Sequence, residues 1–329
     1  MSFAEIIMNP GSNQASLSWS SEEANQLLNG DVSAAAYSEN EPSPQGSTKV
    51  STSIRSAGGI TLSAPAKTVQ IFDTGSYSHQ PSVNARAALV MDGQTGEVLY
   101  SKNSNTAFPI ASITKLMTAV VIADARLNMS ENITLQQIDF AGAGGKNSSS
   151  TLRAGDSMNR AEALLFALMK SENPAAAALA RTYPGGRAAF VAAMNAKAKA
   201  LGMHSSRYVE SSGLDPRNVS SARDLGILVN TAAQYGLIRQ FSTTPSYDFN
   251  LGYRVLKSSN TNALVRNGGW NINISKTGYI NEAGRCVVMH TTLNNRPAVV
   301  VLLGADTSAA RTSDATRLMT WVTQLPKRI

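Results

Sequence analysis

Hydrophobic and polar positions divide the chain near residue 83. Residues 1–82 are rich in Ser, Asn, Gly, Pro and Thr and show little hydrophobic periodicity. Such a composition buries too little apolar surface to offset the entropy of the chain. We therefore expect residues 1–82 to be disordered or loosely attached and residues 83–329 to form one folded domain.

The first periodic elements are a strand pair followed by helices. Two strand-like runs, 87–92 and 97–102, flank the sequence G-Q-T-G and predict a β-hairpin. A dense apolar run predicts a buried helix that starts with Pro109 and continues to Arg126. Further helices are predicted at about 160–170, 174–182, 186–201 and 221–236.

The last third of the chain changes to strand periodicity. Runs at 270–279, 285–293 and 298–305 are separated by the turn sequences N-E-A-G and N-N-R-P. A closing helix from about Thr312 to Leu325 carries its apolar residues on one face, which favours packing on the sheet over lying on a membrane. The element order predicts an α+β domain whose antiparallel sheet joins both ends of the chain.

Composition and charge disfavour membrane-spanning and nucleic-acid-binding proteins. The 329 residues carry a formal net charge of +7 and contain no apolar run long enough to span a membrane. Residues 1–80 contribute −4 of this charge and the remainder +11, but the basic residues are scattered, so nucleic-acid binding is not expected. The first residues lack the basic and apolar regions of a signal peptide.

Several catalytic classes are disfavoured by the residues themselves. The single cysteine, Cys286, lies in an apolar run and is expected to be a small core residue. His79, His204 and His290 are far apart and show no metal-ligand spacing, so neither a metal site nor a cofactor is predicted. No G-x-S-x-G sequence is present, which disfavours a Ser-His-Asp hydrolase.

Ser112-Ile113-Thr114-Lys115 is the first motif that carries chemistry. A serine hydroxyl needs a base at neutral pH, and residues three apart share one face of a helix, so Lys115 can reach Ser112. Burial or nearby cations must lower the pKa of Lys115 for this role. Alone, the pattern equally fits a capping serine followed by a solvated lysine.

Two further motifs lie downstream. Ser171-Glu172-Asn173 lies between two predicted helices, where Ser171 could relay a proton and Asn173 could hold a substrate carbonyl, or both could simply cap helices. Lys276-Thr277-Gly278 is expected at the end of a strand. There the lysine offers a positive charge, the threonine a hydroxyl for a carboxylate and the glycine room for a substrate backbone, unless the segment is an ordinary strand end.

The three motifs together resemble the penicillin-recognising serine hydrolases. They follow in this order, about 60 and 100 residues apart, and P-I-A-S-I-T-K-L-M-T-A, Y-P-G-G, S-S-G-L and S-K-T-G-Y extend the likeness to the D-alanyl-D-alanine peptidase branch, the low-molecular-mass penicillin-binding proteins. The resemblance covers residues 84–325 and implies a β-lactamase/transpeptidase-like fold, with helices packed around the antiparallel sheet.

The resemblance implies a role for each motif residue. Ser112 would form the acyl-enzyme and Lys115 would accept its proton. Ser171 and Asn173 would assist proton transfer and substrate binding. The substrate carboxylate would bind Lys276 and Thr277, beside Gly278. The backbone N–H groups of Ser112 and Tyr279 would form the oxyanion hole.

The implied substrates are peptidoglycan stem peptides, and β-lactams would act as covalent inhibitors. An endopeptidase that cuts D-alanyl cross-links is favoured because Glu172 stands where carboxypeptidase relatives usually have glycine. It is also favoured because only 51 residues follow Gly278, too few for the second domain and membrane anchor of those relatives. The alternative is a carboxypeptidase that removes the terminal D-alanine.

Two further alternatives are less favoured. A β-lactamase needs a deacylating glutamate, and no acidic residue lies between Glu172 and Glu210. A non-catalytic β-lactam sensor would be attached to a membrane segment, which this chain lacks. The substrate implies a periplasmic location, and the sequence does not indicate an oligomeric state.

Overall fold

The computed structural model describes residues 7–8, 15–16, 69–74, 77–142 and 150–326. The expectation of disorder for residues 1–82 falls largely outside the described residues. Within this segment the structure has three two-residue strands: β1 (Ile7–Met8), β2 (Ala15–Ser16) and β3 (Phe72–Asp73). Among the described residues, no helix combines the length and apolar character that crossing a bilayer requires.

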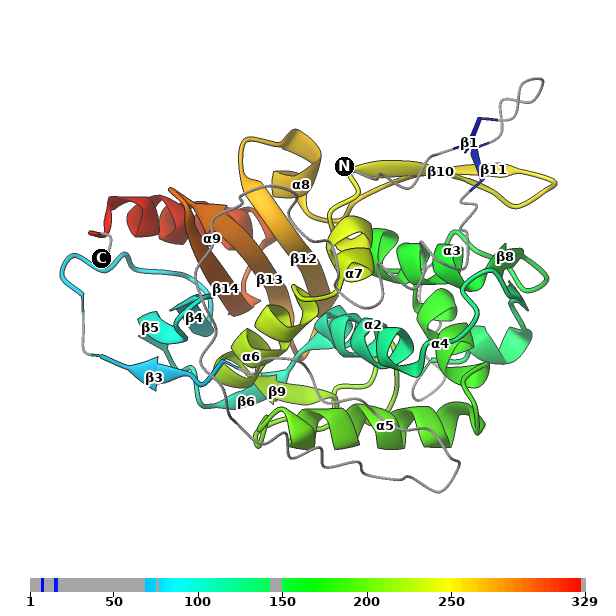
Figure 1. Cartoon of the computed structure of the whole chain (residues 1–329), viewed down its shortest axis with the longest axis horizontal. Helices are drawn as coiled ribbons and strands as arrows, with labels where there is room; N and C mark the ends of the chain where they lie inside the picture. Colours follow the sequence, from blue (N-terminus) through cyan, green and yellow to red (C-terminus); the bar gives the residue numbers. More distant parts are fainter. Residues whose placement is uncertain (1–6, 9–14, 17–68, 75–76, 143–149, 327–329) are drawn as a thin grey trace, which may run out of the picture.

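A six-stranded sheet joins the two ends of the folded region (Figure 1). Its strands are, in spatial order, β12 (Asn271–Ile280), β13 (Gly284–Leu293), β14 (Arg296–Ala305), β4 (Ala87–Asp92), β5 (Glu97–Lys102) and β3. All neighbouring pairs are antiparallel except β3 and β5. The predicted β4–β5 hairpin, the three C-terminal strands and the joining of both chain ends are therefore confirmed.

Alternate residues of the central strands face two separate cores. On β14, Val299 and Val301 pack with the helical block, whereas Val300 and Leu302 pack against the C-terminal helix. Both faces of the sheet are buried, so the strands read as continuous apolar runs. The C-terminal helix α9 (Ser308–Gln324) lies on one face, and most other helices, α2 and α6 among them, lie on the opposite side (Figure 1).

Helix α9 packs on the sheet as predicted. Its Leu318 is fully buried, which contributes about 1.5–3 kcal/mol. The helix begins four residues earlier than expected, because the Thr307 side chain caps it by accepting the N–H of Ala310.

The helical block lies between β5 and β12 in the chain. Its helices are η1 (Ala111–Ile113), α2 (Thr114–Ala125), η2 (Gln137–Phe140), α3 (Arg160–Leu165), the π-helix η4 (Phe166–Lys170), α4 (Asn173–Arg181), α5 (Gly186–Ala200), α6 (Ala222–Ala232), α7 (Gly236–Ser242) and α8 (Ala263–Asn267). Short antiparallel pairs accompany them: β6 (Ala107–Pro109) with β9 (Val219–Ser221), β7 (Asn132–Thr134) with β8 (Ser157–Asn159), and β10 (Ser246–Asn250) with β11 (Val255–Ser259).

Three boundary predictions are wrong. Pro109 ends strand β6, where it pairs with Val219, so the helical turn starts only at Ala111. The helix expected over 221–236 ends at Ala232, and the separate helix α7 follows from Gly236. The motif expected at a strand end instead lies within β12, which continues to Ile280.

Candidate active site

Ser112 lies in a tight helical turn that enters helix α2. The preceding residue, Ala111, has φ 48°, in the left-handed region that a residue with a Cβ seldom adopts. No side chain caps η1, and the N–H of Ile113 bonds the Ile110 carbonyl. This strained entry gives Ser112 a partly exposed side chain at the start of a buried helix.

Two glycines let neighbouring segments approach this turn closely. A Cβ at Gly278 would lie 3.0 Å from both the Ile110 oxygen and the Ser112 nitrogen. Gly213 has φ 91°, and a Cβ there would lie 1.8 Å from the Ala111 oxygen. Strand β12 and the loop of Gly213 therefore both lie against the Ser112 backbone, and only glycine fits at position 213.

Lys115 directs its amine toward Ser112, as the helical spacing predicts. Its Nζ donates to Ser112 Oγ at 2.8 Å, to Asn173 Oδ1 at 2.6 Å and to the Ser212 carbonyl at 2.7 Å. These three acceptors match the three protons of an ammonium group. The side chain is fully buried, so the alternative of a solvated lysine is wrong.

Burial lowers the pKa of Lys115 to about 7, while the charges of Glu210 and Glu172 act in the opposite direction. An amine with such a pKa exists in both protonation states near neutral pH, so it can accept a proton and return it. Desolvation therefore supplies the pKa shift that the sequence analysis required of a base.

Ser171 and Asn173 flank a break between two helices. The π-helix η4 ends at Ser171, which has φ 65°, and α4 begins at Asn173. Their side chains form no helix caps, so that alternative is wrong. Asn173 bonds Lys115, and Ser171 Oγ accepts a hydrogen bond from Lys276 Nζ at 2.9 Å.

Lys276 and Thr277 lie on β12, which is the edge strand of the described sheet beside η1. Lys276 Nζ also donates to the Thr277 carbonyl, and Thr277 Oγ1 donates to Thr261 Oγ1 at 2.6 Å. Burial, followed by the charges of Lys115 and Arg311, lowers the pKa of Lys276. These surroundings therefore disfavour the positive charge that the sequence analysis expected on Lys276.

The predicted site residues thus meet at one place. Lys115 donates hydrogen bonds to both Ser112 and Asn173, and Lys276 donates one to Ser171. Tyr279 follows on β12 with a 46% exposed side chain, and the Arg285 guanidinium lies 3.5 Å from its ring centroid. The oxyanion role of the Ser112 and Tyr279 N–H groups stays a prediction.

Sequence reasoning missed a partly buried carboxylate that organises the third wall. Glu210 accepts the N–H groups of Ser212 and Gly213, both at 2.5 Å, and the side-chain amide of Asn218 at 3.0 Å. This fixes the loop whose Ser212 carbonyl holds Lys115. The sequence S-S-G-L marked the loop, but no motif marked Glu210.

Two other residues near the motifs were not assigned roles in this geometry. Arg311 on α9 is close enough for its charge to lower the pKa of Lys276, and it places a guanidinium behind β12. Glu172 is buried and accepts hydrogen bonds from the hydroxyls of Ser150, at 2.5 Å, and Thr151, at 2.6 Å. It therefore fixes the break between Ser171 and Asn173.

Cys286 and His290 lie outside this cluster. Burial raises the pKa of the Cys286 thiol to about 11, and burial lowers the pKa of His290 to about 4. Cys286 is fully buried in the core, as predicted. The arrangement that remains is a serine hydroxyl beside a buried amine, with an amide and a second amine opposite, which suits nucleophilic attack on a carbonyl.

Comparisons with known proteins agree with this chemistry. The peptidase S11 family, described as D-alanyl-D-alanine carboxypeptidase, matches residues 74–307. A D-alanyl-D-alanine endopeptidase of Pseudomonas aeruginosa is 47% identical over 250 residues, which cover 74% of this chain and 78% of the relative. One from Escherichia coli is 45% identical over 246 residues, with the same coverage of both chains.

Similarity extends to a carboxypeptidase and to solved structures. A D-alanyl-D-alanine carboxypeptidase of Bacillus subtilis is 31% identical over 269 residues, which cover 79% of this chain and 68% of the relative. The crystal structure of the Streptomyces K15 DD-transpeptidase matches with a TM-score of 0.69 and 28% identity, covering 75% of this chain and 99% of that one.

Proposed function

The chain belongs to the peptidase S11 family, and from this premise we propose that it is a serine DD-peptidase that cleaves D-alanyl cross-links between peptidoglycan stem peptides. Its relatives at 45–47% identity are named D-alanyl-D-alanine endopeptidases, in keeping with the sequence likeness to penicillin-binding protein 7. The observation that carries the chemical part is the hydrogen bond that the fully buried Lys115 Nζ donates to the partly exposed Ser112 Oγ.

Catalysis would begin with proton transfer from Ser112 to neutral Lys115. The Ser112 oxygen attacks the D-alanyl carbonyl carbon, and the oxyanion that forms accepts hydrogen bonds from the backbone N–H groups of Ser112 and Tyr279. Losing one such donor typically costs about 100-fold to 1000-fold in rate. The hydrogen bonds of Lys115 to Asn173 and to the Ser212 carbonyl hold the amine in place during this step.

The leaving amine would receive a proton from the opposite wall. Lys276 donates to Ser171 Oγ at 2.9 Å, so a proton can pass from Lys276 through the Ser171 hydroxyl to the nitrogen of the breaking bond. Thr277, with the charges of Lys276 and Arg311 nearby, binds the carboxylate next to that nitrogen. The proton that Lys115 took from Ser112 then replaces the one that Lys276 gave up, so Lys115 is neutral again. In the second half of the reaction Lys115 accepts a proton from the water that attacks the acyl group and returns it to the Ser112 oxygen as the acyl bond breaks.

β-Lactams are proposed as covalent inhibitors, because their ring carbonyl would acylate Ser112 in the same way. The substrate places the protein in the periplasm. A carboxypeptidase activity on stem peptides with a terminal D-alanine is the second candidate, favoured by the 31% identity to a carboxypeptidase of Bacillus subtilis. Both reactions use the same residues and differ only in the amine that leaves.

The function is tested with purified cross-linked muropeptide dimers. We expect the dimers to be converted to monomers, and product analysis by mass spectrometry identifies the bond that is cut. Pentapeptide monomers tested alongside measure the carboxypeptidase alternative. No product from protein that binds penicillin would refute the endopeptidase proposal, and rapid turnover of a chromogenic cephalosporin would indicate a β-lactamase instead.

The nucleophile is tested with Ser112→Ala. This variant should lose both penicillin labelling and dimer cleavage. The matched control is Ser313→Ala, which removes an exposed hydroxyl from α9 and should retain both. Labelling retained by Ser112→Ala, or a penicilloyl group found by mass spectrometry on another residue, would overturn the assignment.

A further inference from the structure

A cavity beside Asn173 is not used by the proposed chemistry. It has a volume of about 320 Å³, and its lining includes Asn173, Ser212 and Leu214 from the active-site walls. Pockets of this size accommodate small ligands or parts of larger ones. The cavity therefore borders the catalytic cluster, because it shares Asn173 and Ser212, both of which accept hydrogen bonds from Lys115.

One face of helix α4 forms a wall of this cavity. Asn173, Ala177 and Ala180 all line it, and residues spaced by four and three positions share one face of a helix. At 1.5 Å per residue, the wall extends about 10 Å from Asn173 to Ala180. The alanines keep this face free of long side chains, so an extended group of about that length fits along it.

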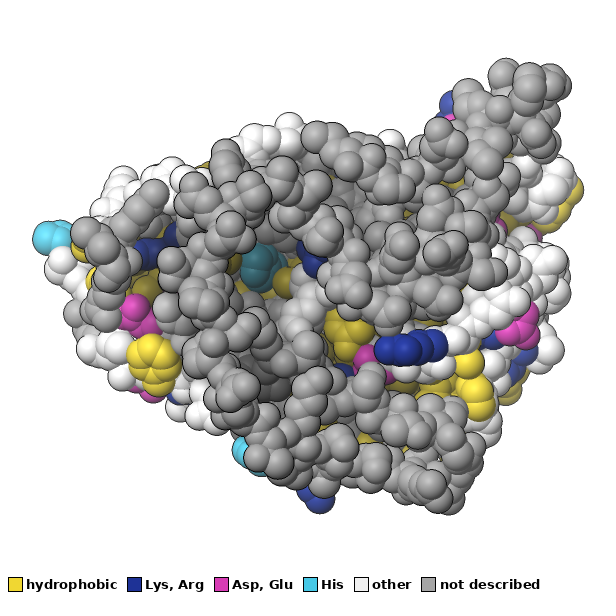
Figure 2. All heavy atoms as spheres, viewed as in Figure 1, with side chains coloured by type: hydrophobic (Ala, Val, Ile, Leu, Met, Phe, Trp, Pro, Cys, Tyr) yellow, Lys and Arg dark blue, Asp and Glu magenta, His cyan; other side chains and the backbone are white. Residues whose placement is uncertain are grey.

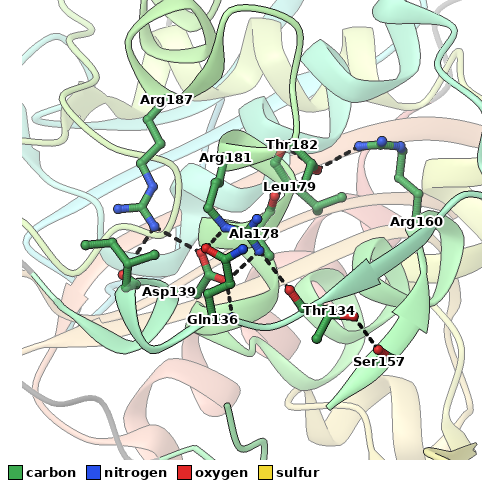
Figure 3. Close-up of polar contacts among 11 residues, drawn as sticks. Thr134, Gln136, Asp139, Ser157, Arg160, Ala178, Leu179, Arg181, Thr182 and Arg187 are labelled. Carbon is green, nitrogen blue, oxygen red and sulfur yellow. Dashed lines mark hydrogen bonds and ion pairs between the residues drawn. The ribbon is translucent and has the colours of Figure 1, made fainter. Parts of the chain in front are cut away.

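Figure 3 shows two arginines, Arg181 and Arg187, directed at Asp139, which lines this cavity. The side chain of Asp139 is fully buried and pairs with two guanidinium groups, Arg181 at 2.9 Å and Arg187 at 3.0 Å. One carboxylate thus faces two cations. Arg181 uses Nε and Nη2 on Asp139, which leaves it paired if Arg187 is removed.

Arg187 is the member of this cluster that a ligand can reach. It lines the cavity, its side chain is 39% exposed, and its hydrogen bonds to the described residues use only Nη2, which donates to Asp139 and to the Ile138 carbonyl. It lies in the first turn of α5, which begins without a side-chain cap and without an acidic residue. Both the guanidinium and the helix N-terminus favour an anion there.

The other charges around the cavity are already paired. Asp215 accepts two hydrogen bonds from Arg217 Nε, at 3.0 and 3.1 Å, and a third from Nη2 at 2.6 Å, and this guanidinium lowers the pKa of Asp215. Glu210 is taken up by backbone N–H groups of its own loop. On the described part of the face drawn in Figure 2, basic side chains are likewise interspersed with acidic and apolar ones rather than gathered in one field. The excess at Arg187 is therefore a local feature.

We propose that this cavity binds the side chain of the diamino acid in the acyl-donor stem peptide, with its terminal carboxylate on Arg187. The proposal rests on the proposed function. In the donor stem the diamino acid directly precedes the D-alanine that acylates Ser112. Its side chain is therefore attached one residue from the scissile carbonyl and ends in a carboxylate and an amine, about the reach that α4 offers. Arg187 would be a specificity-determining residue.

The same chemical group occurs in the acceptor stem, where the carboxylate lies next to the scissile nitrogen. The acceptor carboxylate is the one that the proposed function assigns to Lys276 and Thr277. The experiment must therefore distinguish the effect of the donor carboxylate from that of the acceptor carboxylate. Synthetic cross-linked dimers are prepared in three forms: unmodified, with the donor side-chain carboxylate amidated, and with the acceptor carboxylate amidated. Each is tested with the whole chain.

For the unmodified protein, we expect donor amidation to lower kcat/KM about tenfold, mainly through KM. Arg187→Gln should lower kcat/KM for the unmodified dimer by a similar factor and should no longer distinguish donor-amidated from unmodified dimers. Acceptor amidation should lower kcat/KM equally in both proteins. This double comparison isolates the contact between Arg187 and the donor carboxylate from general effects of the substitution.

Two further variants control the comparison. Arg187→Lys retains the charge and should recover part of the discrimination. Arg153→Gln removes an exposed arginine that does not line the cavity and should behave like the unmodified protein. Thermal unfolding checks that Arg187→Gln remains folded, as expected while Arg181 still pairs with Asp139.

The outcomes separate this inference from the proposed function. Dimer cleavage that ignores donor amidation, or Arg187→Gln that still discriminates, overturns the inference and leaves the peptidase in place. If no dimer is cleaved, the proposed function fails. Competition of the same peptides with penicillin labelling then still measures whether donor amidation weakens binding through Arg187.

Discussion

The protonation of Lys115 gives a prediction whose size follows from its burial. The side chain is fully buried, and its pKa falls from 10.5 to about 7. At pH 7 about half of the molecules then hold a neutral amine, against about 0.03% at the ordinary pKa. Burial therefore raises the fraction of competent base roughly 1600-fold, which corresponds to about 4 kcal/mol.

Acylation by penicillin should follow this fraction. Lys115 accepts a proton only when neutral, so the rate should rise with pH, with a midpoint near 7, and should be about 50-fold lower at pH 5 than at pH 7. Glu172 is one of the charges that raise the pKa of Lys115. Glu172→Gln removes that charge, so the midpoint should move to lower pH.

The assay is the second-order rate of labelling by a fluorescent penicillin, measured from pH 5 to pH 9. Asp248→Asn is the matched control, because Asp248 is an exposed carboxylate on β10, and its midpoint should stay in place. A midpoint near 10 in the unmodified protein would refute the argument from burial. A midpoint that Glu172→Gln moves to higher pH would refute the sign of the electrostatic effect.

Three further predictions follow from single contacts. Gly213→Ala places a Cβ 1.8 Å from the Ala111 oxygen, so it should shift the nucleophile turn and lower the penicillin acylation rate about 100-fold or more. Asn173→Asp places a carboxylate on Lys115 Nζ, so the midpoint of the acylation profile should move to higher pH and the rate at pH 7 should fall. The Cys286 thiol, buried with its pKa raised to about 11, should react with a thiol reagent only after denaturation; rapid native labelling would contradict its placement in the core.

Local periodicity predicted the long elements that form the six-stranded sheet or pack on it. The hairpin β4–β5, the strands β12–β14 and helix α9 all follow the expected runs. Among the short strands that were missed, β6 and β9 are stabilised by a partner distant in sequence. Strand β6 is three residues long and exists through its pairing with β9, more than 100 residues away, which is also why Pro109 ended a strand rather than started a helix.

The sequence predicted which residues form the candidate site, but not the burial and the hydrogen bonds that surround them. Spacing placed Ser112 and Lys115 on one helical face, and the order of the motifs suggested that the other walls meet them. The pKa of Lys115 depends on burial and on Glu210, and its third hydrogen bond goes to a backbone carbonyl, that of Ser212. A backbone oxygen leaves no residue signature, so sequence reasoning had no signal for it.

For Glu172, the sequence and the structure give complementary information. In the sequence it was only the middle residue of the Ser171-Glu172-Asn173 motif, and it favoured an endopeptidase because carboxypeptidase relatives usually have glycine there. In the structure its carboxylate is buried, accepts the hydroxyls of Ser150 and Thr151, and raises the pKa of Lys115. A glycine at 172 would leave both hydroxyls without this acceptor and would remove one charge that keeps Lys115 protonated. Glu172 therefore couples the shape of the Ser171 wall to the pH at which Lys115 can accept a proton.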